Sequence, residues 1–328
     1  MNRAFIKPVV IFTVIFAAGG CSSKFKTVFS EKQRHPIMFT KIEDGYMATD
    51  EGRQVFFYRT KPKCLDGKYC RADYIHPLYG LDGEILTEDF PEDHRHHRGI
   101  FWAWHQNYIG NKSVGDSWIL EDFIYDVRDV KILDIDCKSG ALQATVYWKS
   151  PLWKEKSGDL KPFVKQTTII RVHHTGGDIQ KIDFEISLLA LEEGFRIGGS
   201  DNEKGYGGFS TRIRLPDGTK FIGAKGEVEP QWASVEAGPW LDFYGAFRAD
   251  GNISGLAVMN HISNPCFPRR WILRRKDSMQ NAVWPGREPV PLSTQEPVVL
   301  RYRLIIYRGN AGSLDLDKLQ KEYNQNVR

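Results

Sequence analysis

The chain has 328 residues and a formal net charge of +4, with 41% hydrophobic and 26% charged residues. This balance is ordinary for a folded soluble protein, and it excludes a disordered chain, a collagen-like chain and a multi-span membrane protein. The length suffices for two average domains or one large β-domain. Aromatic residues reach 12% and include nine Trp, which favours a large β-core, with sugar-stacking surface tryptophans as the alternative.

The first 21 residues have the pattern of an export signal. Arg3 and Lys7 precede an apolar run over 8–18, which is too short to span a bilayer comfortably, and Ala18-Gly-Gly-Cys21 follows. Small residues before a Cys are typical of bacterial lipoproteins. We therefore predict a signal peptide over 1–21, lipidation of Cys21 and a tether over 22–35. The protein would be periplasmic or at the cell surface, anchored to outer-membrane lipid; an ordinary secretory signal is the alternative.

Without Arg3 and Lys7, 43 basic side chains face 41 acidic ones, a net charge of only +2. This balance gives no reason to expect a nucleic-acid partner. No protein partner can be inferred from the sequence.

Export permits disulfides, and four Cys follow Cys21. Cys64 and Cys70 flank an Asp-Gly turn signal, so they form either a hairpin disulfide or two free thiols. The Cys spacing does not fit a zinc knuckle.

Residues 36–328 read as one domain made of strands. Apolar or alternating β-rich runs recur between turn signals such as Asp82-Gly83 and Asp217-Gly218. The runs are 55–58, 141–148, 164–173, 182–189, 255–258 and 298–307. Only the end of the chain has helical spacing, with Ser313 as a candidate N-cap. Strands without alternating helices predict an all-β fold, a large antiparallel β-sandwich with one short C-terminal helix.

The densest polar cluster is Asp93-His-Arg-His-His-Arg-Gly99, followed by the apolar run 100–104. On an extended strand, His94 and His96 would face one way and His97 the other. Imidazoles suit proton transfer near neutral pH, which we favour. A divalent metal held by His94 and His96 is the alternative, and it needs a third ligand such as His76, His105 or His261. A solvated basic loop is the non-functional interpretation.

Two further clusters lie more than 100 residues downstream. The glycine-rich stretch 199–214 contains Tyr206, a candidate acid or base if a cation lowers its pKa, and Arg212, whose planar guanidinium suits a carboxylate. The stretch 260–276 contains His261 at a strand exit and Arg270 among basic residues that alternate with apolar ones. The dinucleotide, haem and iron–sulfur signatures are missing, so no obligatory redox cofactor is expected.

Segments 74–79, 93–102 and 260–265 together resemble the PmoA-like family, whose label is methane oxygenase. The resemblance runs roughly from Phe39 to Arg308. A methane monooxygenase subunit would be strongly apolar and membrane-spanning, and this chain is neither. Family members resemble secreted β-sandwich proteins of polysaccharide-degrading bacteria. The resemblance therefore implies a role on acidic carbohydrates, as a dehydratase of uronic-acid oligosaccharides such as ulvan fragments.

Removal of a hydroxyl β to a uronate carboxylate needs a base, an acid and a group that stabilises the enolate-like charge. We expect His97 or His94 as the base, Tyr206 as the acid, and His261 as a supporting residue or alternative base. The remaining side chains would bind the substrate: Arg98, Arg212, His96, Trp104 and Arg270. The product would be a 4,5-unsaturated uronate.

Two other functional classes stay open. One is another sugar-active enzyme, either an epimerase or mutarotase or a glycoside hydrolase, which would use paired carboxylates such as Asp201 with Glu203 or Glu227 with Glu229. The other is a noncatalytic glycan-binding lipoprotein with a platform of exposed tryptophans. The platform would comprise Trp102, Trp104, Trp118, Trp271 and Trp284. We expect the three clusters to converge on one concave face, because convergence distinguishes a site from three unrelated basic loops. His97, Tyr206, Arg212 and His261 should then lie around one pocket.

Overall fold

The computed structural model describes residues 37–268, 270–276 and 279–325. The expected signal peptide, the lipidated Cys21 and the tether over 22–35 lie outside these residues. The described residues belong to one compact unit.

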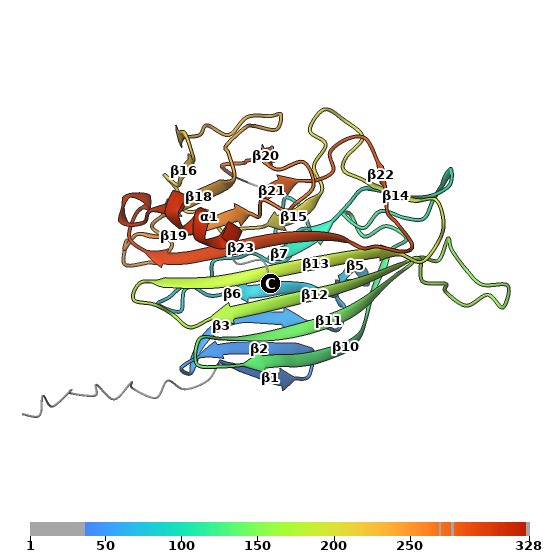
Figure 1. Cartoon of the computed structure of the whole chain (residues 1–328), viewed down its shortest axis with the longest axis horizontal. Coiled ribbons are helices and arrows are strands. Elements are labelled where there is room, and N and C mark those ends of the chain that lie inside the picture. Colours follow the sequence, from blue (N-terminus) through green and yellow to red (C-terminus); the bar gives the residue numbers. More distant parts are fainter. Residues whose placement is uncertain (1–36, 269, 277–278, 326–328) are drawn as a thin grey trace, which may run out of the picture. The chain divides into compact units, whose positions relative to one another are not determined.

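Strands make up most of the unit and form two large antiparallel sheets (Figure 1). The eight-stranded sheet has the order β1 (Met38–Ile42), β2 (Gly45–Asp50), β3 (Arg53–Arg59), β6 (Tyr74–Leu78), β7 (Ile100–Ala103), β15 (Gly208–Thr211), β21 (Gln280–Val283) and β20 (Trp271–Ile272). The nine-stranded sheet has the order β10 (Ile124–Ile135), β11 (Ser139–Lys149), β12 (Val164–His173), β13 (Ile179–Ala190), β23 (Val298–Arg308), β19 (Ser254–Asn260), β18 (Trp240–Gly245), β16 (Lys220–Gly223) and β17 (Gly226–Glu227).

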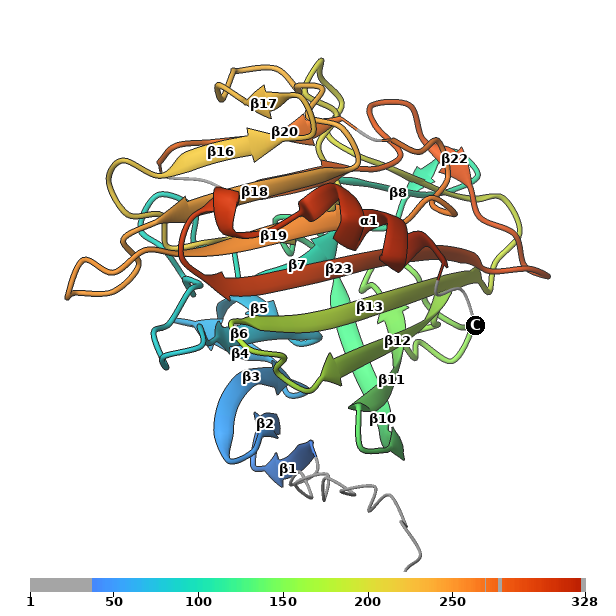
Figure 2. The same ribbon diagram turned by 60° about the vertical axis from the view of Figure 1, so that its left-hand side comes forward.

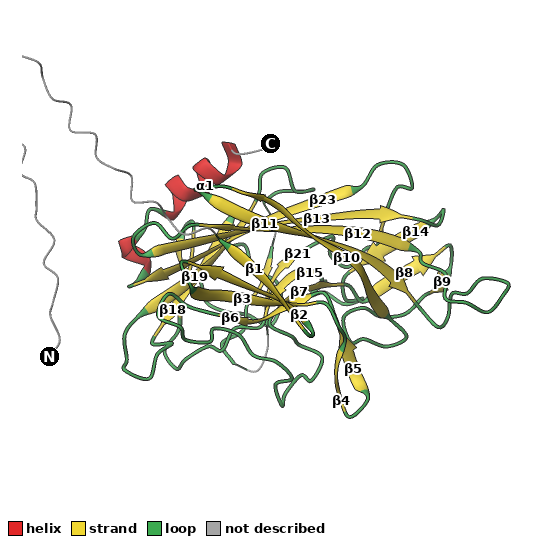
Figure 3. Ribbon diagram, turned by 90° about the horizontal axis from the view of Figure 1, so that it is seen from below, coloured by secondary structure: helices red, strands yellow, loops and turns green. Residues whose placement is uncertain are grey.

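Two smaller sheets complete the strands. One has the order β22 (Val290–Pro291), β14 (Phe195–Gly198), β8 (Gln106–Ile109) and β9 (Lys112–Ser113). The other is the hairpin of β4 (Lys63–Leu65) and β5 (Lys68–Arg71), which projects from the sheets in Figure 3. A disulfide joins Cys64 to Cys70 across this hairpin, which decides between the two states left open by the sequence. Cys137 and Cys266 are free and exposed.

The long central strands follow from period-two patterning. Along β12 and β13, buried residues alternate strictly with half-buried or exposed ones, so each strand presents one apolar face. The inward residues of both large sheets pack into one shared core, to which Trp102 and Trp148 contribute. The two layers are visible edge-on in Figure 3. The predicted all-β sandwich with a short C-terminal helix is confirmed for the described residues.

Each large sheet also has an outer face with its own small cluster. On the eight-stranded sheet, Phe101 and Ala103 of β7 point outward and pack against Trp118. On the nine-stranded sheet, Ala257 and Ile305 pack beneath helix α1 (Leu316–Gln325), which crosses β19 and β23 in Figure 2. The two outer clusters therefore lie on opposite sides of the shared core.

Helix α1 begins differently from the prediction. The Ser313 hydroxyl bonds back to Asn310 O within the short 3-10 turn η1 (Ala311–Ser313). Asp315 is the cap instead, because its Oδ1 accepts from Lys318 N at 2.9 Å. Within the described residues, no helix has the length and apolar character needed to cross a bilayer.

Candidate functional site

The histidine cluster lies on a loop over 89–99 that is tied at both ends. Asp89 and Arg98 pair as an isolated antiparallel bridge. Gly99 then enters β7 with φ of 48°, and its N–H donates to Glu88 O at 2.8 Å. A Cβ at Gly99 would collide with the backbone of Ile75. Only glycine fits this left-handed position without strain, which explains the glycine that ends the cluster.

The cluster forms a turn, so the two-sided arrangement that an extended strand would give these histidines does not apply. His97 N donates to His94 O at 2.9 Å, which folds the chain back on itself. The three imidazoles consequently gather instead of splitting between two faces. The rings of His94 and His97 stack at 4.6 Å, and His96 contacts both of them edge-on.

His94 is held by a carboxylate that is itself clamped. Arg212 donates through Nη1 and Nη2 to the two oxygens of Asp93, both at 2.7 Å. These bonds help to lower the pKa of Asp93 to about 2, against the opposing effect of partial burial. Asp93 Oδ2 lies 2.6 Å from His94 Nδ1. A carboxylate only accepts hydrogen bonds, so it places the proton on Nδ1 and leaves Nε2 as the base. The His94 side chain is 41% exposed.

A second carboxylate holds a second imidazole nearby. His105 Nδ1 lies 2.7 Å from Asp116 Oδ2. The other oxygen of Asp116 accepts from the backbone N–H groups of Trp118 and Ile119 at 2.8 and 3.0 Å, which fixes the carboxylate. His105 Nε2 is buried and has no hydrogen-bond partner among the described residues.

Positive charge surrounds the two inner imidazoles. His97 is buried, and burial together with its imidazole and arginine neighbours holds its pKa well below the usual value. The pKa of His96 falls to about 4 for similar reasons, burial first. Arg71 acts on both of them and is itself fully buried, with Nε and Nη1 unpartnered. The resulting positive potential favours an anionic ligand.

Tyr206 packs against the Asp116-held imidazole. Its ring lies 4.9 Å from the rings of both His105 and Trp118. Burial raises the pKa of Tyr206, with Asp116 adding to the rise and Arg274 opposing it. The expected role of Tyr206 as an acid or base depended on a cation that lowers its pKa. This environment raises the pKa instead and keeps the phenol protonated and able to donate.

The two arginines expected on the substrate are already occupied. Arg98 is fully buried and donates through Nε to Asp89 at 2.5 Å, through Nη1 to two backbone carbonyls and through Nη2 to Tyr74. Arg212 is buried and divides its donors between Asp93 and Glu88. Both guanidiniums therefore hold the loop in place, and their N–H groups are already bonded within the protein and not available to a substrate carboxylate.

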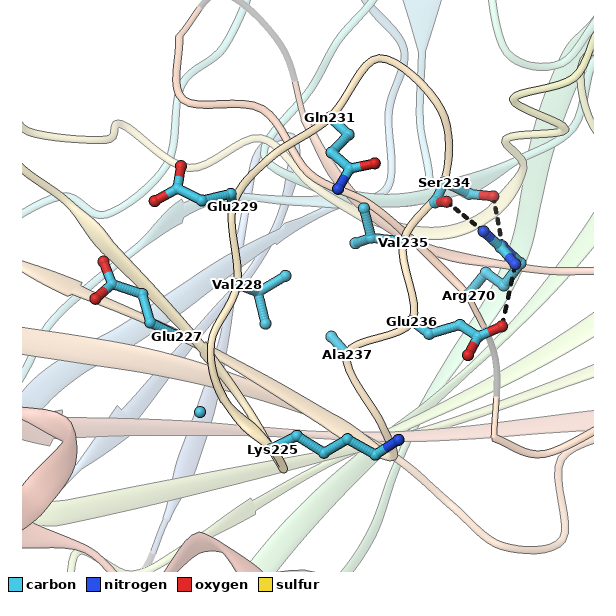
Figure 4. Close-up of a pocket in the computed structure, with 11 residues that line it drawn as sticks. Lys225, Glu227, Val228, Glu229, Gln231, Ser234, Val235, Glu236, Ala237 and Arg270 are labelled. Atoms are coloured by element: carbon cyan, nitrogen blue, oxygen red, sulfur yellow. Dashed lines mark hydrogen bonds and ion pairs between the residues drawn. The ribbon is translucent and has the colours of Figure 1, made fainter.

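His261 and Arg270 do not join this cluster. His261 packs edge-on against Tyr323 of α1 at 4.9 Å, on the outer side of the nine-stranded sheet. Arg270 bonds Ser234 and Glu236 on the loop over 225–237, as Figure 4 shows. The structure thus brings together His97, Tyr206 and Arg212 and leaves His261 on the opposite face of the sandwich. The expected convergence of all four is wrong.

The proposed tryptophan platform is also wrong. Its five members are at most 3% exposed and belong to the core clusters: Trp102, Trp104, Trp118, Trp271 and Trp284. Trp104, expected to bind the substrate, instead donates through Nε1 to Trp284 O at 2.8 Å. Among the nine tryptophans, all within the described residues, only Trp232 is exposed, at 58%.

A metal at His94 and His96 lacks a complete ligand set. Among the residues that the structure describes, no three His, Cys, Asp or Glu side chains meet in a group that could hold an ion. His76, one suggested third ligand, has Nδ1 3.0 Å from the Thr87 hydroxyl.

Cavities are found at two places outside the histidine cluster. One of about 220 Å³ is lined by Arg212 and Glu88 among others. The other, of about 380 Å³, lies within the loop over 225–237 (Figure 4). Neither is lined by a histidine of the cluster.

A family model covers most of the sandwich, from residue 47 to residue 323. The chain belongs to DUF6807, a family of unknown function. This match corrects the expected resemblance to the PmoA-like family, which the comparison does not bear out. No curated protein is significantly similar to the chain.

Sequence reasoning missed the carboxylates and cations that organise the site. His105 was considered only as a metal ligand, and Asp116 was not considered, although a His and an Asp on either side of a turn are a usable signal. Trp232 lies in a polar, proline-containing segment, Glu229-Pro-Gln-Trp232, which is a sign of exposure. Nothing local marks Arg71 as buried.

Proposed function

We propose that the protein is a hydro-lyase, an acid–base enzyme that removes water from the uronic-acid end of an acidic oligosaccharide. One observation carries the proposal: two imidazoles, His94 and His105, are each oriented by a carboxylate. Ring contacts through His97 and Trp118 connect both of them to Tyr206. Positioned imidazole and phenol groups are suited to moving protons to and from a substrate. The positive potential at the cluster supports an anionic substrate.

His94 is the base in this proposal, because its Nε2 has no hydrogen-bond partner among the described residues and its side chain is accessible. Nε2 takes the proton from the carbon next to the uronate carboxylate. The electron pair of that C–H bond becomes the 4,5 double bond as the C4–O bond breaks. Tyr206 gives its proton to the departing hydroxyl, which leaves as water. The proton on His94 later returns to the tyrosinate, so no oxidant or reductant is needed.

The inner groups have supporting roles. His105, held by Asp116, packs edge-on against the Tyr206 ring and so positions the phenol. Arg71 provides the positive charge that stabilises the enolate-like charge, usually the largest electrostatic contribution to such a reaction. The lowered pKa values of His96 and His97 leave these two imidazoles neutral beside it. Arg212 positions Asp93 and so acts through His94.

The experiment is an absorbance assay near 235 nm with ulvan-derived oligosaccharides that end in a uronate. The proposal predicts a rise from the conjugated double bond. H94Q and Y206F should each lower turnover about 10²-fold or more. The matched control is H173Q, because His173 is also held by a carboxylate, with Nε2 2.7 Å from Asp183, but lies on β12 of the other sheet. Turnover of H94Q and Y206F within twofold of the parent would contradict the proposal.

A second candidate is an epimerase, favoured by the presence of two carboxylate-held imidazoles. A proton could leave one face of the carbon to His94 and arrive from His105 on the other. This reaction gives no absorbance at 235 nm, but in D₂O it places deuterium on the carbon. The hydrolase alternative has less support, because Asp201 and Glu229 are ion-paired with Arg287 and Arg275, and Glu227 with Lys220.

A further inference from the structure

The one exposed tryptophan lies beside the proposed acid. Arg274 donates through Nη2 to Trp232 O at 2.8 Å and through Nη1 to Gln231 O at 2.5 Å. The same arginine interacts electrostatically with Tyr206. Lys204, two residues before Tyr206, places Nζ 4.8 Å from the centre of the Trp232 ring. Trp232 is therefore a neighbour of the Tyr206 loop and not an isolated surface residue.

The loop that carries Trp232 is braced at several points. Beyond the two bonds from Arg274, Arg270 donates to the hydroxyl and the carbonyl of Ser234 at 2.8 and 2.6 Å. Figure 4 shows Arg270 joining Ser234 and Glu236 across the loop. A side chain held on a braced loop loses less conformational freedom when it binds a ligand. An indole that is 58% exposed at such a place leaves apolar area available for contact.

The ammonium of Lys204 beside Trp232 is the second feature of this surface. Lys204 makes no ion pair with any residue that the structure describes. Of the acids in the two loops, Asp201 and Glu229 are paired with Arg287 and Arg275, whereas the exposed Glu203 next to Lys204 has no ion pair among the described residues. A flat apolar ring next to an unneutralised ammonium matches a pyranose that has one C–H face and one anionic substituent.

We propose that Trp232 and Lys204 form a binding subsite for a second, acidic sugar ring, adjacent to the ring on which Tyr206 acts. Trp232 stacks on the apolar face of this ring, and Lys204 pairs with its anionic group. The subsite rests on the proposed function, because it makes the enzyme prefer an oligosaccharide over a single uronate. Both residues are positioning residues and do not touch the reacting atoms.

The test is calorimetric titration of the purified protein with three probes: an ulvan-derived tetrasaccharide with a uronate end, glucuronic acid, and neutral cellotetraose. The parent should bind the acidic tetrasaccharide at least tenfold more tightly than either other probe. W232A should weaken tetrasaccharide binding about tenfold, as expected from uncovering roughly 60 Å² of apolar contact. W232F should recover most of this loss. K204Q should weaken it about threefold and reduce its salt dependence.

The matched control is W153A, because Trp153 also carries a lysine over its ring, Lys112 at 5.5 Å, but belongs to the segment between β11 and β12. W153A should bind like the parent. Tetrasaccharide affinity of W232A within twofold of W153A, or a parent that binds the tetrasaccharide no better than glucuronic acid, would overturn the subsite.

Activity separates this proposal from the one above. If tetrasaccharide binding depends on Trp232 but no rise in absorbance at 235 nm occurs, the hydro-lyase proposal is refuted and the subsite is supported. If the parent turns the substrate over and W232A has the parent's binding affinity and KM, the hydro-lyase is supported and the subsite is refuted.

Discussion

Asp242 is a single carboxyl that makes stability depend on pH. It lies on β18, buried on the outer face of the nine-stranded sheet, where it accepts from the Tyr307 hydroxyl at 2.7 Å while Oδ1 has no partner. Burial raises the pKa of Asp242 to about 7, against the lowering effect of the tyrosine bond. In the unfolded chain the same group ionises near pH 4.

As pH rises from about 4 to about 7, the unfolded chain therefore loses this proton before the folded chain does. Stability should fall over this window, by up to about 4 kcal/mol. D242N cannot ionise and should flatten the fall, becoming more stable than the parent at pH 8. Urea unfolding at pH 5 and pH 8 measures this. D217N, at a side chain that is 94% exposed, is the control; an equal pH dependence in D242N and parent would rule out Asp242 as the source.

Helix α1 depends on its cap and on its contacts with the sheet. Asp315 caps the first turn, and Trp240 of β18 donates through Nε1 to Asp317 at 2.8 Å. Gln320 reaches the end of β19 through a bond to Asn260 O at 2.8 Å. The helix is therefore fixed to the sheet by polar as well as apolar contacts.

D315A should lower the free energy of unfolding by about 1 kcal/mol, because an N-terminal N–H group loses its acceptor. S313A should change it by much less, since Ser313 lies before the helix and bonds only within η1. Thermal unfolding of the two variants makes the comparison. A larger loss in S313A would restore Ser313 as the cap that the sequence suggested.

Across the whole molecule, one buried carboxylate links the two large sheets. Asp73 accepts from the Tyr58 hydroxyl of β3 at 2.6 Å and from Trp102 Nε1 of β7 at 3.0 Å. It also accepts from Gln166 Nε2 of β12, in the opposite sheet, at 2.5 Å. Burial raises the pKa of Asp73 to about 6, although these three bonds oppose the rise.

D73A should destabilise the fold by about 3–5 kcal/mol, because it leaves three buried donors in the core without an acceptor. D73N should cost less, because its carbonyl oxygen still accepts. Chemical denaturation with D217A as the exposed control tests the order. If D73A cost no more than D217A, the network would not contribute to joining the sheets.

The sequence by itself determined the fold class and the central strands. β12 begins and ends at the predicted residues, and β13, β19 and β23 extend the predicted runs by at most a few residues at each end. Side-chain alternation along a strand is local, so it is readable without knowing the neighbours. The 12-residue edge strand β10 was missed, because its many charged side chains hide the alternation.

Tertiary structure alone decided the roles within the site. The sequence shows that His, Tyr and Arg occur in clusters, but not that Arg212 would be clamped by Asp93, 119 residues away, or that Arg98 would be buried. It also could not show that five tryptophans would enter the core while Trp232 stayed outside. Ion pairs and burial depend on which strands become neighbours, a long-range property of the sheet order. The side-chain types of the site were therefore predictable, whereas their partners and accessibility were not.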